Sequence, residues 1–475
     1  MAMRRSRVSR RVRALTATDA ALAIAGAACL LLGGASAGGA IANASLQLGA
    51  IGILVWLAWT PTQAKARPEL HPLRWLLVGL GVVGAVQFLP LPPTIWEALP
   101  GRGVFGAEYR LLGMDAPWLT LTLAPDRAVS SLLALLPFLA TLLLTLRSSP
   151  AGRVAFIWVA IAVAALSIAV GSAQLFSGGT SRFYFYDNTN HGDAVGFFAN
   201  RNHLATLFLM TLPFVAALAA RDAQSASKER ARRAPLYAGC FAFLTFGAAL
   251  NGSSAGLALL GPCIGASALL YLHGVGRPVP ARIVATGAVL MAVGLLFVSV
   301  GPYHGRFLDK AISGGNSATR GTSIALTGHA ARDFLPLGSG IGSFRHIYTR
   351  YENVDTLNNA FVNHAHDEYV EIALETGVLG IALVVGLCAW LAIRGRALWS
   401  KDMGSTGSIA RAGLVSTVLL MLHSLVDYPA RTAAILCLAG FAIGVIADPR
   451  ASGTVAPRPE EEPSAEATTR VFVAD

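Results

Sequence analysis

Residues 154–176 read VAFIWVAIAVAALSIAVGSAQLF, a run without a single charged side chain. A helix of about 20 mostly apolar residues is long enough to cross the hydrocarbon core of a bilayer. Because no water is available there, every backbone N–H and C=O group must bond within the segment, and a helix achieves this. The stretch therefore predicts a transmembrane helix.

The rest of the chain has the same character. Of its 475 residues, 54% are hydrophobic and 13% are charged, whereas a soluble domain carries about 25% charged residues. The mean hydropathy of +0.57 agrees. We therefore predict an all-α, polytopic membrane protein with about 12 transmembrane helices. Besides 154–176, the expected spans cover about residues 19–37, 45–61, 73–90, 128–146, 203–220, 236–250, 255–273, 283–300, 378–393, 410–426 and 431–447.

These spans divide the chain into five expected parts. They are a basic arm (1–18), nine transmembrane helices (19–300), a large late exterior loop with an amphipathic helix (301–377), three more transmembrane helices (378–447) and a tail (448–475). The prolines, glutamates and small polar residues of the tail predict disorder. The Ala-Ser-Ala at 35–37 also resembles a signal-peptide cleavage site, but the distribution of charge favours an uncleaved first span.

The lysines and arginines between the spans indicate which side is cytoplasmic. If the spans alternate in direction, the basic loops all lie on the side of the N-terminal arm. The strongest cluster is Arg221, Lys228, Arg230, Arg232 and Arg233. Positive charge in short loops marks the cytoplasmic face, so both termini are expected there. The net charge of +11 is spread over these loops instead of forming one patch, so no nucleic-acid partner is expected.

The opposite, exterior face holds the longer polar segments. These are residues 91–127, 177–202 and 301–377. Long connections of this kind are often functional, and the last one contains the densest set of His, Arg and Asp. We therefore expect the chemistry of this protein on its exterior face.

The last loop contains His364, His366 and Asp367, followed by an amphipathic segment. Asp367, Glu371 and Glu375 are four residues apart, so a helix places them on one face. Three interpretations of the histidines remain open: a metal site with Asp367, His366 as a general base that accepts a proton from a hydroxyl, or a histidine capping an interfacial helix. The metal site is the least favoured, because no further strong His or Cys ligands accompany the pair.

Arginines supply a second set of candidates. Arg320 lies in the last loop, and Arg201 stands between Asn200 and Asn202 where a span begins. A guanidinium binds phosphate oxygens in a bidentate fork, so these two arginines could hold a lipid pyrophosphate. Interfacial anchoring or ion pairing is the alternative.

Two further features lie on the exterior side. Asp427 and Arg431 flank Tyr-Pro-Ala and are expected to pair across a tight turn, with His423 on the same helix face as Asp427. Residues 336–344 (PLGSGIGSF) are rich in glycine but do not follow a nucleotide-binding pattern. They predict a bend, or backbone N–H groups directed at an anion.

In their order and spacing these motifs resemble the O-antigen ligase and O-antigen polymerase (WaaL/Wzy-like) superfamily of membrane glycosyltransferases. Residues 196–205 (GFFANRNHLA) are similar to the Asn-x-Asn segment of that family. Arg320, followed by 336–344, resembles the loop arginine and its glycine turn. The stretch 366–380, with its histidine and two glycines, resembles the ligase signature. The resemblance covers about residues 156–446.

The resemblance implies a GT-C-like fold and an inverting, metal-independent glycosyltransferase in a bacterial inner membrane. It implies transfer of a glycan from undecaprenyl pyrophosphate to a hydroxyl of another glycan or of lipid A core, without a cofactor. His366 would act as the general base, and Arg320 and Arg201 would hold the pyrophosphate. Supporting roles would fall to Asn200, Asn202, His364, Asp367, Glu371, Glu375 and Asp427.

Two departures from the family keep other functions open. Asp367 stands where the family usually has Asn, Ser or Gln. The family often has Ser-Arg-Gly near the exterior end of a middle span, whereas residues 252–256 read GSSAG, with no arginine at Ser254. Arg201 is expected to replace it. The alternatives are a lipid-linked-glycan flippase or other transporter, which the scarcity of mid-span charges disfavours, and a non-catalytic scaffold of an envelope polysaccharide assembly complex.

Overall fold

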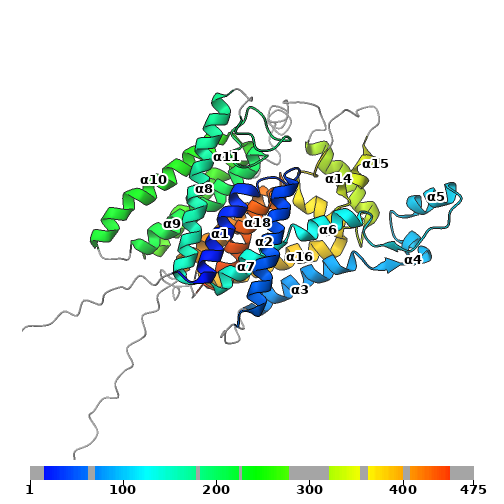
Figure 1. The fold of residues 1–475 in the computed structure, drawn as a ribbon, viewed down its shortest axis with the longest axis horizontal. Helices are drawn as coiled ribbons and strands as arrows, with labels where there is room; N and C mark the ends of the chain where they lie inside the picture. The colour runs from blue at the N-terminus through cyan, green and yellow to red at the C-terminus, as the bar shows by residue number, and fades with distance from the viewer. Residues whose placement is uncertain are drawn as a thin grey trace, which may run out of the picture.

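The computed structural model describes residues 15–61, 70–177, 182–223, 227–277, 320–352, 362–399 and 407–449. For residues 227–229 and 320 it describes the backbone alone. Figure 1 shows a bundle of long helices with shorter elements gathered at one side of it.

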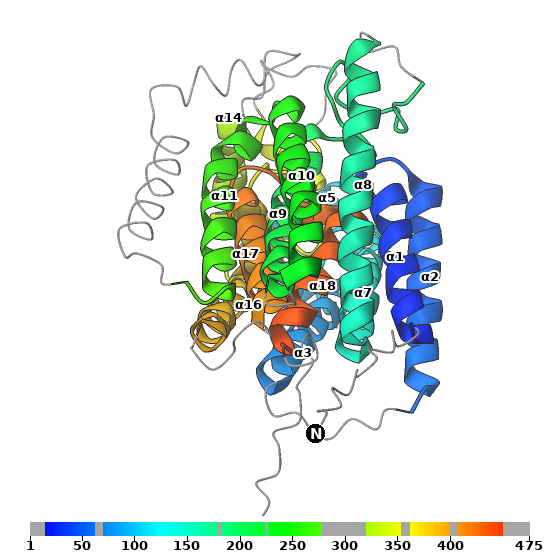
Figure 2. The same ribbon diagram turned by 90° about the vertical axis from the view of Figure 1, so that its left-hand side faces the viewer.

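The bundle is built from apolar helices, as the sequence predicts. They are α1 (Ala17–Leu32), α2 (Ala40–Trp59), α3 (His71–Val86), α6 (Pro125–Leu133), α7 (Leu136–Arg147), α8 (Pro150–Phe176), α9 (Arg201–Asp222), α10 (Ser227–Asn251), α11 (Ser254–Gly274), α16 (Glu368–Leu398), α17 (Ser408–His423) and α18 (Ala433–Ala447). Figure 2 shows most of them running side by side.

Wherever the chain is described, each expected span overlaps a helix, and one span is divided between two helices. Seven are long and apolar enough to cross a membrane if α6 and α7 are taken as one, and four more apolar helices have 10–17 residues. The expected span 283–300 lies outside the described residues. The count of 12 spans therefore stays a prediction, whereas the helical membrane architecture is confirmed.

One expected span is interrupted. The structure divides the region expected as 128–146 into α6 and α7, with a break at Ala134 and Leu135. Pro137 lies in the first turn of α7. Proline has no N–H to donate to the preceding turn, and its ring disfavours a helix just before it. Hydropathy alone does not reveal such a break.

Helix α9 forms the centre of the bundle. Apart from Ala219, every residue from Asn202 to Ala220 is buried. Helices α8, α10, α11 and α17 pack against it, and Figure 2 shows α9 among α10, α11 and α17. Asn200 caps the start of the helix, and its side chain accepts a hydrogen bond from the backbone N–H of Asn202 at 2.8 Å. Polar groups at this end of α9 are therefore held inside protein rather than in contact with lipid.

A smaller group of elements covers one end of the bundle. It contains β1 (Pro90–Leu91), α4 (Pro93–Ala98), α5 (Gly103–Leu111), β2 (Leu119–Thr120), α14 (Arg320–Phe334) and α15 (Phe344–Tyr351). The two strands pair antiparallel. Phe334, Phe344, Ile347 and Leu374 form a separate hydrophobic core there. The buried guanidinium of Arg102 donates to the backbone oxygens of Leu121 and Gly338, and so ties the two halves of this group together.

Helix α16 bends at Gly377, where φ is +58°. The bend separates the short segment 368–376 from the apolar run that follows. A side chain at Gly377 would collide with the carbonyl oxygen of Pro336, and one at Gly338 would lie 2.7 Å from the carbonyl oxygen of Glu375. The glycine-rich stretch 336–344 and the bend of α16 thus pack backbone against backbone, which explains the glycines at both places.

Candidate functional site

Polar side chains from four separate elements meet at one end of the bundle. The elements are the first turn of α9, the residues just before α16, the end of α17 with the turn after it, and η4 (Pro429–Arg431). Asp427, in the turn after α17, is the common partner of these groups. Its side chain is completely buried.

Asp427 contacts residues that are far away in the sequence. The side-chain amide of Asn202 donates to Oδ2 of Asp427, and the backbone N–H of Tyr428 donates to Oδ1 at 2.8 Å. Nδ1 of His366 lies 3.5 Å from the same Oδ1. Nε2 of His203 lies 3.9 Å from it. A buried carboxylate is stable only where hydrogen-bond donors surround it, and the amide of Asn202 and the backbone N–H of Tyr428 are such donors.

His366 is held in an unusual backbone conformation. Its φ is +60°, and it is the one non-glycine residue with positive φ in the described part of the chain. This conformation costs roughly 1–2 kcal/mol for an L-residue. Strain of this kind gathers at functional sites because the surrounding structure enforces it. The side chain is 23% exposed, so one ring nitrogen faces Asp427 while the opposite nitrogen is accessible.

Three histidines surround the ring of Tyr428. The centroid of that ring lies 5.2 Å from His203, 4.4 Å from His364 and 5.1 Å from His366. Aromatic rings at such distances fix one another's orientation. Tyr428 therefore acts as a spacer that positions the three imidazoles.

His203 joins this site, although it is not among the site residues expected from the sequence. Both of its ring nitrogens are buried, and neither has a hydrogen-bond partner in the described structure. The signal was present, since His203 follows the Asn-Arg-Asn segment directly and shares a helix face with Thr206. Thr206 in turn bonds Nδ1 of His423 at 2.9 Å. This places a second layer of polar groups beneath Asp427.

Arg431 does not pair with Asp427, and that prediction is wrong. The guanidinium instead contacts Glu368 at 2.9 Å, Glu371 at 3.2 Å and Glu375 at 3.7 Å. The reason is local: the 3-10 turn η4 directs Arg431 towards the acidic face of α16, away from the buried Asp427. Burial alone would lower the pKa of Arg431, but the three carboxylates outweigh it and raise that pKa above its ordinary value.

The acidic face of α16 holds the histidine segment and the glycine turn in place. Glu371 accepts hydrogen bonds from Nδ1 of His364 and from the backbone N–H of Ala365, both at 2.8 Å. Glu375 accepts from the backbone N–H of Gly342 at 2.9 Å and of Phe344 at 3.3 Å. The N–H groups of the glycine turn are therefore directed at the carboxyl group of Glu375, from the chain itself.

Asp367 caps the segment that follows His366. Its side chain accepts from the backbone N–H groups of Tyr369 at 2.8 Å and Val370 at 3.1 Å. Burial raises the pKa of this carboxyl, although the two N–H groups act in the opposite direction. The residue that caps this helix is therefore Asp367, and not the neighbouring His366.

Of the two candidate arginines, the structure describes the side chain of Arg201 but only the backbone of Arg320. Nη1 of Arg201 lies 3.0 Å from Oδ1 of Asp193, and the side chain is 22% exposed. The backbone of Arg320 begins α14, but its side chain lies outside the described residues. Its expected role as a pyrophosphate ligand therefore stays a prediction.

Ser254, the first residue of α11, stands where the family pattern has an arginine, and it directly follows Ser253. Ser253 caps α11 and donates to Oδ1 of Asn202 at 2.7 Å. Asn202 thus links Ser253 to Asp427, so this part of the chain supports the buried carboxylate. In the described residues, no group of three or more His, Cys, Asp or Glu is placed to hold a metal ion.

Comparison with known proteins finds a family similarity over part of the chain. The model of the O-antigen ligase family, Wzy_C, matches residues 239–385. The match contains His364, His366, the glycine turn and the acidic face of α16, and it confirms the resemblance drawn from the motifs. No curated protein matches the chain.

Proposed function

We propose that this chain, which carries an O-antigen ligase domain over residues 239–385, transfers a glycan from undecaprenyl pyrophosphate to an acceptor hydroxyl at the exterior face of a bacterial inner membrane. The family match and the apolar helices support a multi-pass membrane protein of polysaccharide biosynthesis. The observation that carries the residue assignment is the pair formed by His366 and Asp427. One imidazole nitrogen faces a buried carboxylate and the other is accessible.

In this proposal His366 is the general base. Its accessible nitrogen takes the proton of the acceptor hydroxyl as the oxygen attacks the anomeric carbon of the donor glycan. The bond from that carbon to the pyrophosphate oxygen breaks, and undecaprenyl pyrophosphate leaves with the electron pair. A single displacement inverts the anomeric configuration. The proton stays on His366 until water or the leaving group removes it.

Asp427 positions His366 and stabilises the imidazolium that forms. A carboxylate beside one imidazole nitrogen fixes the tautomer and favours the charged ring. Asn202 holds Asp427 through its amide, and Asn200 starts the helix that carries Asn202. Because Asp427 is buried, its charge is weakly screened, which strengthens this effect.

Arg201 and Arg320 are the proposed pyrophosphate ligands. Two guanidinium groups would hold the leaving group and neutralise the charge that develops on it. Arg201 would have to exchange its contact with Asp193 for the donor phosphate. The glycine turn does not contribute here, because Glu375 already accepts from its N–H groups.

Arg431 and the three glutamates are proposed to hold the framework. Glu371 bonds the side chain of His364 and the backbone of Ala365, which are the two residues that precede His366. Asp367 caps the helix one residue after it. His366 is thus fixed from both sides, which accounts for its strained backbone.

The assignment is tested in cells with His366→Ala and Arg320→Ala. Both variants should lose surface polysaccharide and accumulate the lipid-linked precursor at normal protein level. His329→Ala and Arg332→Ala are matched controls, because both residues are exposed on α14 and outside the proposed site. Wild-type surface glycan in His366→Ala would refute the assigned base. The species that accumulates separates the two acceptors: single repeat units indicate a polymerase, and full-length lipid-linked chains indicate a ligase.

A further inference from the structure

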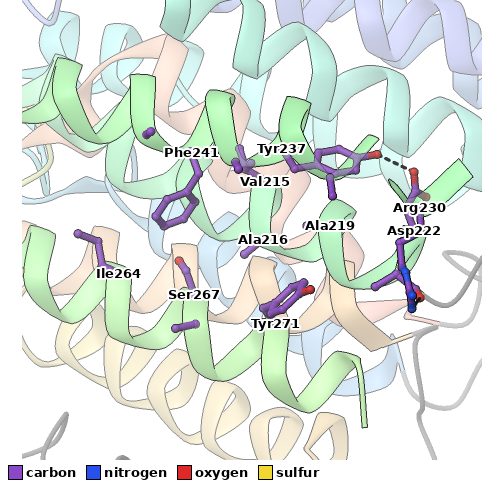
Figure 3. A pocket seen from close by; sticks show the side chains of 15 residues that line it. Val215, Ala216, Ala219, Asp222, Arg230, Tyr237, Phe241, Ile264, Ser267 and Tyr271 are labelled. Carbon is purple, nitrogen blue, oxygen red and sulfur yellow. Dashed lines mark hydrogen bonds between the residues drawn. The ribbon is translucent and has the colours of Figure 1, made fainter. Parts of the chain in front are cut away.

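A pocket that differs chemically from the candidate functional site lies between α9, α10 and α11. It has a volume of about 520 Å³, within the range of about 300–1,000 Å³ common for ligand sites. Figure 3 shows it lined by Val215 from α9, Tyr237 and Phe241 from α10, and Ile264 and Tyr271 from α11. Helices α10 and α11 both pack on α9 and diverge around this space.

The pocket lies far from the candidate active site. That site uses the first residues of α9, whereas the pocket is bordered by Asp222, the last residue of the same helix. A helix of this length spans roughly 30 Å. The pocket therefore belongs to the end of the bundle that the basic loops predict to be cytoplasmic, and the proposed glycan transfer makes no use of it.

Small side chains on α10 leave the space open towards the outside of the bundle. Ala234, Ala238 and Ala242 line the pocket at intervals of four residues, so they share one helix face. All three are exposed, as are Ile264 and Tyr271 across the gap. In a membrane this exposed apolar surface faces lipid tails. The pocket is thus a slot that an apolar chain can enter sideways.

The polar end of the slot carries positive charge. Asp222 is neutralised there, since Arg233 lies 2.9 Å from its Oδ2 and the hydroxyl of Tyr237 donates to the same oxygen at 2.7 Å. Arg230 lies beside Asp222 at this end in Figure 3. Within the described structure, its guanidinium donates only to the backbone oxygen of Ala223, at 3.4 Å. Residues 221–233 contain five basic and two acidic residues, so an anion is favoured here.

We propose that this slot binds one anionic phospholipid of the surrounding leaflet, with an acyl chain between α10 and α11 and its phosphate at Arg230. An apolar groove that ends at a basic, membrane-edge cluster has the chemistry of such a lipid, because basic pockets between helices on the cytoplasmic side bind anionic head groups. A zwitterionic lipid of the same chain length fits the slot equally well but gains less from Arg230. The lipid would fill the gap between two helices that diverge from α9.

The test is native mass spectrometry of the full-length, delipidated protein in detergent. Phosphatidylglycerol and phosphatidylcholine with identical acyl chains are added separately. The affinity for the first bound lipid molecule is measured from the fraction of protein that carries one lipid. Phosphatidylglycerol should bind about fivefold more tightly, the effect expected for roughly one favourable charge contact at the membrane surface. Arg230→Gln should remove that preference and leave phosphatidylcholine binding unchanged. Arg232→Gln, also exposed on α10 but outside the pocket lining, should alter the preference less than about twofold.

A second pair of variants tests the slot itself. Ala238→Trp fills it and should abolish the first bound lipid of either kind. Ala249→Trp places the same side chain at an exposed position of α10 that does not line the pocket, and binding should be unchanged. Equal affinity for the two lipids in the wild type, or wild-type binding in Ala238→Trp, would overturn the proposal. So would tighter binding of undecaprenyl phosphate than of phosphatidylglycerol, because the occupant would then be an isoprenoid.

Discussion

Nδ1 of His366 lies 3.5 Å from Oδ1 of Asp427, a carboxylate that is entirely buried. The two residues come from different elements, the segment before α16 and the turn after α17. His366 adopts a backbone conformation with positive φ at this position. Asn202, from a third element, donates a hydrogen bond to Asp427. The arrangement leaves the far side of the imidazole accessible, which a general base requires.

Asp427→Asn should reduce glycan transfer strongly while the protein still folds. The amide keeps the shape of the carboxylate but lacks the charge that stabilises the imidazolium, so we expect a loss of about 10²-fold in kcat. Rates measured on purified protein over a pH series would check this. A structural role alone would lower the amount of folded protein and leave the pH profile of the remaining activity unchanged.

Arg431→Gln should destabilise the end of the bundle at which α16 and η4 meet. It leaves three carboxylates close together with no cation between them, and breaking such a buried pair costs about 3 kcal/mol. Thermal unfolding in detergent measures the effect. Adding Glu368→Gln should recover part of the loss, because one unpaired carboxylate is removed. Arg110→Gln is the control: its side chain is 61% exposed in the pair with Glu97, and the loss of this pair should cost less than about 1 kcal/mol.

Gly377→Ala should also destabilise the protein. The residue has φ +58°, and an added Cβ would collide with the carbonyl oxygen of Pro336. The backbone strain alone is worth about 1–3 kcal/mol. The same substitution at Gly81 in α3, where nothing lies within 4 Å of the new Cβ, should be neutral or stabilise by up to about 1 kcal/mol. Equal melting temperatures for the two variants would contradict the backbone packing described here.

Asp367→Asn should stabilise the protein at neutral pH. Burial raises the pKa of Asp367 in the folded state above its ordinary value of 3.8. As the pH rises from 3.8 towards the higher pKa of the folded state, the carboxyl of Asp367 loses its proton first in the unfolded chain. The folded state therefore loses stability and does not regain it at higher pH. Asparagine avoids this cost and still caps the helix.

The pH dependence distinguishes this effect from capping. The advantage of Asp367→Asn over the wild type should shrink as the pH falls towards 3.8. Asp367→Ala loses the cap as well and should be about 1 kcal/mol less stable than Asp367→Asn at every pH. Activity should survive in Asp367→Asn, since the resemblance places Asn, Ser or Gln at this position. A stability gap that does not change with pH would refute the burial argument.

Much of the fold follows from the sequence because lipid imposes a simple rule. An apolar run such as 154–176 has to be a helix, and α8 covers it. The spacing of Asp367, Glu371 and Glu375 likewise predicts a shared face, and Glu371 and Glu375 both contact Arg431. Both features depend on the spacing of residues within one segment, and this spacing can be read directly from a single sequence.

Contacts between segments are harder to predict. Asn202 meets Asp427 because α9 and α17 pack in one particular register, and hydropathy does not encode that register. The expected pairing of Asp427 with Arg431 failed for the same reason, since proximity in sequence suggested it while the turn η4 directs Arg431 to α16. His203 was overlooked because a histidine within an apolar run usually packs in a core.

The most direct test of the central claim is a transfer assay in proteoliposomes, with the glycan donor linked to undecaprenyl pyrophosphate. The measured quantity is the initial rate at which glycan moves to the acceptor. His366→Ala should lower this rate by about 10²–10⁴-fold, the usual contribution of a general base, while His329→Ala stays near the wild-type rate. Transfer by His366→Ala at the wild-type rate would contradict the account.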